Sequence, residues 1–311
     1  MKCRRCKAPA VIEIPRHNAA FCRECFLRHC REQVRRAIDE HRMFVPGDRV
    51  LVAVSGGKDS LALWHLLTEL GIDADGLYLG LGIGEYSDES GRYARDFAAR
   101  VGAGLHEVDL PTDYGYDVPG AARATRRSPC GACGLSKRHL FNGFALEHGY
   151  DVVATGHNLD DEAAVLLGNV LRWETGYLGR QHPVLPATDG FVKKVKPLVR
   201  LGEREMAAYC VLNGIDYQIE ECPMADGNRH LGLKTTLNAL EEQSPGTKAA
   251  FLFGFLARGH GRFADASDAE RETLAPCSGC GGPTSTGGLC AFCSLRVRVS
   301  NPQPVALRTG R

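Results

Sequence analysis

The sequence lacks the long apolar stretches that a membrane-spanning protein needs, and it lacks a strong excess of charge of either sign. Its 311 residues include 38 Lys and Arg against 37 Asp and Glu, so the formal net charge is +1. A bilayer-spanning helix needs about 20 consecutive apolar residues, and Gly, Arg or Asp interrupts the apolar runs of this chain well before that length. Cys3 and Cys6 occupy the place where the apolar part of a secretory signal would begin. We therefore expect a cytoplasmic protein without membrane contact.

A net charge near zero excludes the uniformly basic surface of many nucleic-acid-binding proteins, but basic residues gather locally. Six arginines lie between positions 23 and 42, three more between 123 and 127, and three lysines between 193 and 196. Such clusters can bind phosphate groups, and they also occur on helix faces that are simply solvated. Both interpretations stay open for each cluster.

Cysteine, in contrast, is abundant, because the chain has 13 and most of them occur in close pairs. In a reducing compartment, paired cysteines indicate metal binding rather than disulfides. Four thiolates complete the shell of a structural zinc ion, so the Cys-x-x-Cys pairs at both ends predict two zinc sites, with redox-active dithiols as the alternative. The expected ligands are Cys3, Cys6, Cys22 and Cys25 for the first site and Cys277, Cys280, Cys290 and Cys293 for the second.

Short apolar segments and amphipathic segments alternate through the middle of the chain. Strands are expected over 49–54, 76–81, 105–110 and 151–155. Helices are expected over 23–42, 60–70, 88–100 with Ser87 as N-cap, 135–148, and from Asp160 or Asp161 to 173. This alternation predicts an α/β fold with a doubly wound parallel sheet, in which ligands bind at the carboxyl ends of the strands.

The same patterns divide the chain into four expected segments. A zinc finger over 1–30 precedes a catalytic α/β domain over 31–200. A helical extension over 201–270 follows, with helices at 203–212, 234–242 and 249–256. A second zinc finger over 271–311 ends the chain.

The first expected strand leads directly into Ser55-Gly-Gly-Lys-Asp-Ser60 at the start of a helix. Backbone N–H groups in such a glycine-rich turn, together with the helix dipole, attract phosphate. The motif is not a Walker P-loop, which needs Gly where this chain has Val52 and Ser or Thr where it has Asp59.

This six-residue motif resembles the PP-loop of the N-type ATP pyrophosphatases, which cleave ATP to AMP and pyrophosphate. The second signature of that family, Gly156-His-Asn-Leu-Asp-Asp-Glu162, follows the fourth expected strand. Together with Cys130-x-x-Cys133, Cys222-Pro223 and the terminal cysteine pairs, the pattern resembles the TtuA branch of the tRNA thiolation enzymes over nearly the whole chain.

The resemblance implies an ATP site and three catalytic residues. Asp59 and Asp161 are implied ligands of Mg²⁺, although Asp161 can also be a simple helix cap. Lys137, four residues after Cys133, would stabilise negative charge on the α-phosphate or the uridine oxygen, with an ordinary surface lysine as the alternative. The implied ATP-binding residues are Ala53, Ser55, Gly56, Gly57, Lys58, Asp59, Ser60, Leu79, Gly156 and Asp161.

Cys130, Cys133 and Cys222 provide three ligands, whereas a zinc site usually needs four. The resemblance implies that they hold a 4Fe-4S cluster with one iron open to sulfur. A zinc site completed by His139 and ordinary core cysteines are the alternatives. Cys30 and Cys210 lie alone in expected helices and are interpreted as small core residues.

The expected function is that of an ATP-dependent, AMP-forming tRNA-5-methyluridine 2-sulfurtransferase, with tRNA and a thiocarboxylated ubiquitin-like sulfur carrier as partners. Uridine 54 in the T-loop is the favoured target and uridine 34 in the anticodon the alternative. Assembly as a homodimer stays open. Two other classes also stay open: an enzyme that joins an amine to a base, such as a lysidine synthetase with structural zinc only, and a non-catalytic zinc-bearing RNA adaptor.

Overall fold

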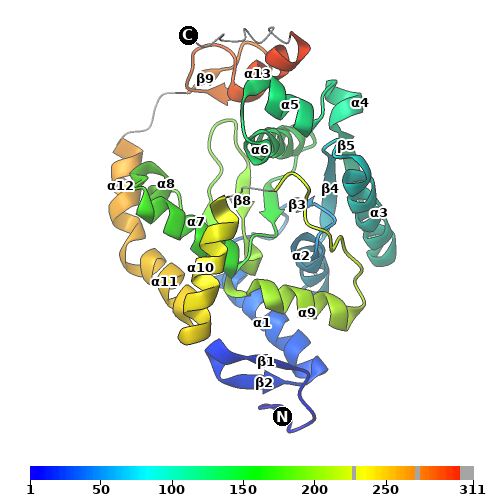
Figure 1. Ribbon diagram of the computed structural model, residues 1–311, viewed down its shortest axis with the longest axis vertical. Coiled ribbons are helices and arrows are strands. Elements are labelled where there is room, and N and C mark those ends of the chain that lie inside the picture. Colours follow the sequence, from blue (N-terminus) through cyan, green and yellow to red (C-terminus); the bar gives the residue numbers. More distant parts are fainter. Residues whose placement is uncertain (226–228, 270–273, 302–311) are drawn as a thin grey trace, which may run out of the picture.

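The computed structural model describes residues 1–225, 229–269 and 274–301 (Figure 1). Two small modules lie at opposite ends of its long axis, and a larger layered α/β body lies between them (Figure 1). The expected boundary between the helical extension and the C-terminal finger, at 270 and 271, lies outside the described residues, as does the end of that finger at 302–311.

A six-stranded sheet forms the centre of the body, in the order β5-β4-β3-β6-β8-β7. The first five of these strands are parallel, and β7 pairs antiparallel with β8. The chain moves outwards from β3 through β4 to β5 and then places β6 on the other side of β3. The carboxyl ends of β3 and β6 therefore form the switch point at which doubly wound folds bind ligands. The strands are β3 Val50–Val54, β4 Ala74–Gly80, β5 Leu105–Asp109, β6 Val152–Thr155, β7 Val184–Leu185 and β8 Lys193–Val195.

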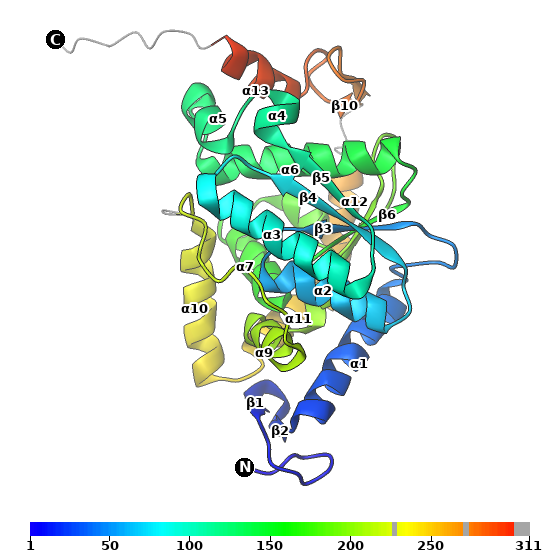
Figure 2. The ribbon, with the colours of Figure 1, turned by 90° about the vertical axis from the view of Figure 1, so that its right-hand side faces the viewer.

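Helices cover both faces of this sheet, as a doubly wound fold requires (Figure 2). The longer helices correspond to the expected ones, although α6 and α10 begin at 129 and 229 rather than at 135 and 234, whereas the short helices α4, α5, α8, α12 and α13 were not expected. The helices are α1 Arg23–His41, α2 Lys58–Glu69, α3 Gly84–Val101, α4 Leu110–Tyr114, α5 Val118–Thr125, α6 Pro129–Glu147, α7 Leu159–Leu171, α8 Thr175–Gly179, α9 Glu203–Asn213, α10 Arg229–Gln243, α11 Thr247–Arg258, α12 His260–Ala269 and α13 Ala291–Ser300.

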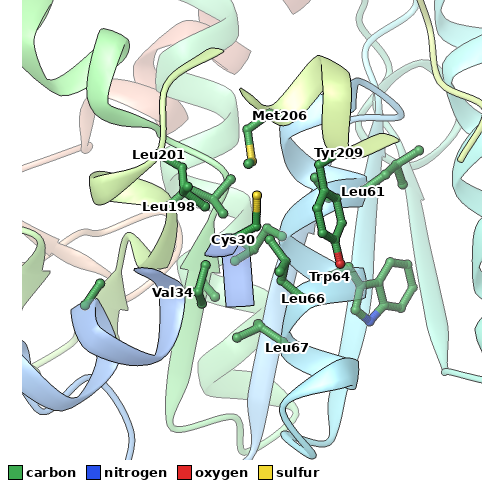
Figure 3. Close-up of a cluster of buried hydrophobic side chains, with 14 of the residues drawn as sticks. Cys30, Val34, Leu61, Trp64, Leu66, Leu67, Leu198, Leu201, Met206 and Tyr209 are labelled. Atoms are coloured by element: carbon green, nitrogen blue, oxygen red, sulfur yellow. The ribbon is translucent and has the colours of Figure 1, made fainter. Parts of the chain in front are cut away.

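Alternate residues of β3 face two different cores, because successive side chains of a strand point to opposite faces. Val50, Val52 and Val54 belong to a core with α1, α2 and α9, whereas Leu51 belongs to a core with α5 and α6. Figure 3 shows the first core around Trp64. Cys30 and Cys210 are fully buried there, which confirms their interpretation as core residues.

The residues expected to begin two further helices, α3 and α7, were also wrong. Ser87 lies inside α3 rather than before it, and its hydroxyl accepts a hydrogen bond from the N–H of Ile83, the actual N-cap residue. Asn158, not Asp160 or Asp161, is the N-cap of α7. In both cases the helix begins earlier than its polar residues suggested, because the chain turns directly at the end of the preceding strand.

The N-terminal module consists of the hairpin of β1 (Ile12–Ile14) and β2 (Ala19–Phe21) and the start of α1. Residue 30, the expected limit of the finger, lies inside α1, which continues from the cysteines into the central body. The C-terminal module contains the short strands β9 (Ala275–Pro276) and β10 (Pro283–Thr284) and the helix α13. Both modules share buried residues with the two main cores.

None of the helices within residues 1–225, 229–269 and 274–301 is long and apolar enough to cross a membrane.

Candidate active site

The loop between β3 and α2 is a tight turn held together by its own serines. The hydroxyl of Ser60 accepts from the N–H of Ser55 at 3.1 Å and donates to the carbonyl of Gly57 at 2.9 Å. Gly56 has φ +75°, and a Cβ at this residue would lie 2.3 Å from the carbonyl oxygen of Ser90, so only glycine fits. The loop therefore presents its backbone at the N-terminus of α2, where the helix dipole favours an anion.

Asn158 brings the two expected acidic residues to this loop. Its amide nitrogen donates to Oδ1 of Asp59 at 3.0 Å, and its backbone N–H donates to Oδ2 of Asp161 at 3.1 Å. Its side-chain oxygen accepts from the backbone N–H groups of Asp160 and Asp161, which completes a capping box. Asp161 thus takes part in capping the helix and also lies with Asp59 at one site.

Gly156 determines how closely β6 approaches the phosphate loop. A Cβ at Gly156 would lie 2.9 Å from the carbonyl carbon of Asp59 and from the backbone nitrogen of Ser60. The other two residues expected near adenine lie on the adjacent parallel strands, since Ala53 is half-buried in β3 and Leu79 is buried in β4.

Two lysines and a glutamate complete the charged cluster. Lys58 contacts Oε1 of Glu203 at 2.8 Å and Oδ2 of Asp59 at 3.2 Å. Lys234 contacts Oδ1 of Asp161 at 2.6 Å and Oε2 of Glu203 at 3.2 Å. The sequence interpretation missed Asn158, Glu203 and Lys234. Asn158 lies within the Gly156–Glu162 signature and could have been inferred from its capping position, whereas the other two come from distant helices without a local signal.

The pKa shifts follow from this crowding of charges. Burial raises the pKa of Asp59, and although Lys58 opposes the rise, the nearby charge of Asp161 adds to it. Burial acts to lower the pKa of Lys58, but Asp59 and Glu203 outweigh it and raise the pKa above its ordinary value. Lys58 is therefore a cation at neutral pH. It lies beside Asp59, a carboxylate that is costly to keep charged, and beside Glu203, whose pKa Lys58 and Lys234 lower against the effect of burial.

The helix α6 begins at the internal cysteine pair. Ser128 caps it through a hydrogen bond from the N–H of Gly131 at 3.1 Å, so Cys130 and Cys133 lie in its first turns. Lys137 is half-buried one turn after Cys133 on the same side of the helix. Burial raises the pKa of Cys130, the thiols of Cys133 and Cys222 add to the rise, and Lys137 opposes it. The charges of Cys133, Cys222 and Lys137 thus act on the thiol of Cys130.

A single segment connects the phosphate loop to the cysteines. The N–H of Gln218 donates to the carbonyl of Gly56 at 2.9 Å, and the carbonyl of Met224 lies 3.8 Å from the thiol of Cys130. Cys222 lies between these anchors. Four residues of extended chain span at most about 14 Å, so Cys222 lies within that distance of Gln218, which contacts the phosphate loop.

The terminal cysteines form two compact groups of four, and in each group the sulfur atoms lie within 4.8 Å of one another. In the C-terminal group, the N–H of Cys290 donates to the sulfur of Cys277 at 3.0 Å. This and further N–H donors lower the pKa of Cys277 to about 6 against the effect of burial. Each group thus offers the four thiols that a tetrahedral metal site needs. Within the described residues, Cys130, Cys133 and Cys222 do not form such a compact group.

The fold and the glycine-rich loop define the chain as a PP-loop protein, and the PP-loop domain model matches residues 27–226. The N-terminal LIM domain of the 2-thiouridine synthetase TtuA matches residues 2–27. The chain belongs to the TtuA family of PP-loop 2-thiouridine synthetases.

Relatives and a solved structure agree with this membership. The chain is 49% identical to the tRNA-5-methyluridine(54) 2-sulfurtransferase of Thermus thermophilus, over 95% of this chain and 91% of that protein. It is 43% identical to the protein of the same name from Pyrococcus horikoshii, over 95% and 93%. It is also similar to the U34-tRNA thiolase NcsA from Methanococcus maripaludis, solved with its 4Fe-4S cluster, with a TM-score of 0.78, 26% identity and 95% of both chains covered.

Proposed function

We propose that the protein uses ATP to activate uridine 54 of tRNA and then replaces the oxygen at C2 of the uracil ring with sulfur. The observation that carries this proposal is the segment 218–224, which contacts the phosphate loop at one end and the thiol of Cys130 at the other. Nucleotide chemistry and sulfur chemistry would thus share one site. The choice of uridine 54 follows the names of the relatives from Thermus thermophilus and Pyrococcus horikoshii.

The activation step uses the phosphate loop and the acidic pair. The uracil oxygen attacks the α-phosphorus of ATP, and the bond from that phosphorus to pyrophosphate breaks. A sulfur nucleophile then attacks C2, and AMP departs with the former uracil oxygen. Asp59 and Asp161 would hold Mg²⁺, which neutralises charge on the phosphates. Lys137 would stabilise negative charge on the α-phosphate or on the uridine oxygen.

The three internal cysteines suit a cluster better than a single zinc ion. A cluster binds each thiolate at a different iron and so needs sulfurs farther apart than one ion does, and these three sulfurs lie outside the compact spacing of the terminal groups. His139, the fourth ligand of the zinc alternative, instead stacks on Phe292 of the C-terminal module, with ring centroids 4.0 Å apart. When bound to Cys130, Cys133 and Cys222, a 4Fe-4S cluster would supply an open iron site for sulfur.

A sulfur donor and two structural metal sites complete the proposed chemistry. The family resemblance supports a ubiquitin-like protein with a C-terminal thiocarboxylate as the sulfur donor. The terminal groups of four thiols would each hold one structural zinc ion, since four thiolates leave no open position for chemistry.

The test separates the two steps by mutation. Release of labelled pyrophosphate, measured with and without tRNA, should disappear in Asp59→Ala and in Asp161→Ala, because both lose Mg²⁺–ATP. Cys130→Ala and Cys133→Ala should still release pyrophosphate in a tRNA-dependent manner but form no thiolated uridine. Nucleoside mass spectrometry of the tRNA identifies the modified position.

Three outcomes would contradict the proposal. Equal pyrophosphate release by the wild type and Asp161→Ala would remove the metal role of that residue. Release without tRNA would indicate a different acceptor. Thiolation at uridine 34 instead of uridine 54 would show that the modified nucleotide lies in the anticodon.

A further inference from the structure

The helix α10 delivers a charged side chain to the phosphate site from outside the PP-loop core. Lys234 lies 2.6 Å from Asp161 and 3.2 Å from Glu203. Its side chain is only 22% exposed. The other oxygen of Glu203 contacts Lys58 of the phosphate loop at 2.8 Å. Two ammonium groups from distant parts of the chain therefore meet at one carboxylate.

The packing of α10 against α7 fixes the position of Lys234 (Figure 1). Ala163 and Ala164 of α7 form a small buried cluster with Leu237 of α10. A Cβ at Gly168 of α7 would lie 2.9 Å from Leu233, the neighbour of Lys234. Small residues on α7 thus let α10 approach closely, and Lys234 lies over the start of α7 where Asp161 is.

A second lysine anchors the same extension without entering the phosphate site. Lys248 of α11 is buried and pairs with Asp160, the neighbour of Asp161. A backbone N–H, that of Glu203, donates to the other oxygen of Asp160 at 2.9 Å. Lys248 and Asp160 therefore connect the helical extension to the core, while Lys234 remains on the side of Asp161 and Glu203.

The charges at the site do not balance, because Asp59, Asp161 and Glu203 outnumber the ammonium groups of Lys58 and Lys234. The ammonium group of Lys234 contacts two carboxylates, at 2.6 and 3.2 Å, which favour its charged form. Lys234 is therefore a cation at neutral pH. A Mg²⁺ ion arriving at Asp161 would compete with Lys234 for the same oxygen, and a phosphate group would offer the displaced ammonium a new partner.

On this basis, and resting on the proposed use of ATP, we propose that Lys234 binds the β- and γ-phosphate groups of ATP and stabilises the departing pyrophosphate. Glu203 holds the ammonium groups of Lys58 and Lys234 beside the loop until the nucleotide arrives. As the bond between the α-phosphorus and the bridging oxygen breaks, negative charge grows on pyrophosphate, and Lys234 donates a hydrogen bond to it. The helical extension thereby contributes a catalytic residue to the PP-loop site.

The experiment compares the binding of α,β-methylene-ATP and of AMP to the full chain in the presence of Mg²⁺. Lys234→Ala should weaken binding of the ATP analogue by about 10- to 100-fold, as expected for one lost hydrogen bond to a charged group. Binding of AMP should change by less than about twofold, because AMP lacks the phosphates that Lys234 contacts. Lys234→Arg should restore part of the loss.

Two control variants separate binding from folding. Thr235→Ala changes an exposed residue of the same helix whose hydroxyl donates to the carbonyl of Leu231, and this variant should bind both nucleotides like the wild type. Lys248→Met should lower the midpoint of thermal unfolding, because it leaves the buried carboxylate of Asp160 without its cation. Lys234→Ala should unfold at nearly the wild-type temperature.

The outcomes distinguish this proposal from the function on which it rests. Unchanged binding of the analogue by Lys234→Ala would overturn the role of the lysine alone. Equal loss of analogue and AMP, with a lowered unfolding midpoint, would show that Lys234 is only structural. A wild type that binds neither nucleotide would overturn the proposed use of ATP itself.

Discussion

At the scale of single residues, Asn158 has two roles. It is the N-cap of α7, and it hydrogen-bonds to both acidic residues of the phosphate site. Its side-chain oxygen caps the helix while its amide nitrogen donates to Asp59. The position of Asp161 therefore follows from the geometry of a helix start, which is rigid. This arrangement explains why a capping role and a metal-binding role for Asp161 do not exclude each other.

Asp59 should lower the stability of the folded protein, although it contributes to the proposed ATP site. Burial, with Asp161, raises the pKa of Asp59 in the folded state, so the folded protein holds the proton more tightly than the unfolded chain. The free energy of unfolding therefore decreases as the pH rises from the ordinary pKa of an aspartate to the raised pKa of Asp59. Asp59→Asn should therefore raise the midpoint of thermal unfolding at about pH 7.5, with a smaller gain near about pH 5. Calorimetry at both pH values measures this, and a midpoint below that of the wild type at the higher pH would contradict it.

Gly156 is the residue at which a single methyl group should damage the site. A Cβ at this position would lie 2.9 Å from backbone atoms of Asp59 and Ser60. Backbone atoms, unlike a side chain, cannot relieve such a clash by a change of rotamer. Gly156→Ala should destabilise the protein by about 1–3 kcal/mol and weaken ATP binding. Denaturant unfolding and nucleotide titration measure the two effects.

The matched control is Gly143→Ala in the exposed part of α6, where a Cβ meets nothing within 4 Å. That variant should be stabilised by about 0.5–1 kcal/mol, because alanine favours a helix over glycine. If both variants behaved alike, the close approach at Gly156 would have no energetic importance.

At the scale of elements, α6 connects the expected sulfur site to the C-terminal module. Cys130 and Cys133 lie at its start, and His139, farther along, stacks on Phe292 of α13. Tyr116 also contacts Phe292, and its hydroxyl hydrogen-bonds to Ser136 of α6. The C-terminal module is therefore part of the packing that fixes α6, rather than a separate appendage.

Phe292→Ala should detach this module. The ring is 2% exposed, and removal of a buried Phe ring typically costs about 3–5 kcal/mol. Val297→Ala on the same helix, where the side chain is 50% exposed, should change stability by less than about 0.5 kcal/mol. Denaturant unfolding of both variants tests the difference, and a loss below 1 kcal/mol for Phe292→Ala would show that the module does not support α6.

At the scale of the whole molecule, we expect two kinds of metal site, in three places along the chain. We expect two zinc ions and one oxygen-sensitive iron–sulfur cluster per chain purified without air, because eight terminal thiols form two compact groups and three internal cysteines remain for a cluster. Metal analysis and visible absorption measure this. Full zinc, no iron and undiminished thiolation would remove the cluster from the mechanism.

The two classes of cysteine should respond differently to mutation. Cys222→Ala should abolish thiolation and keep the fold and zinc content, whereas Cys25→Ala should lose one zinc ion and lower the thermal stability, because metal binding contributes folding energy in such modules. Retained thiolation in Cys222→Ala, with loss in Cys30→Ala or Cys210→Ala, would identify a different set of ligands.

Local patterns in the sequence were sufficient for four of the six strands of the sheet, the long helices, the phosphate loop and the terminal cysteine groups, whereas the short strands β7 and β8 were not expected. Each depends on residues close together in the chain: apolar runs for strands, glycines for the turn at Gly56, and Cys-x-x-Cys pairs for compact thiol groups. The family resemblance implied one site for Asp59 and Asp161, and the structure brings them together because both follow strands that end at the same edge of a parallel sheet.

Only the tertiary structure determined the partners of those residues. Glu203 and Lys234 reach the phosphate loop because α9 and α10 pack against α2 and α7, and no spacing in the sequence encodes that packing. The contact between 218–224 and both the loop and Cys130 likewise depends on the path of the chain. Long-range ion pairs depend on how whole elements pack, so the sequence determined the chemical groups of the site and the fold determined which charges meet.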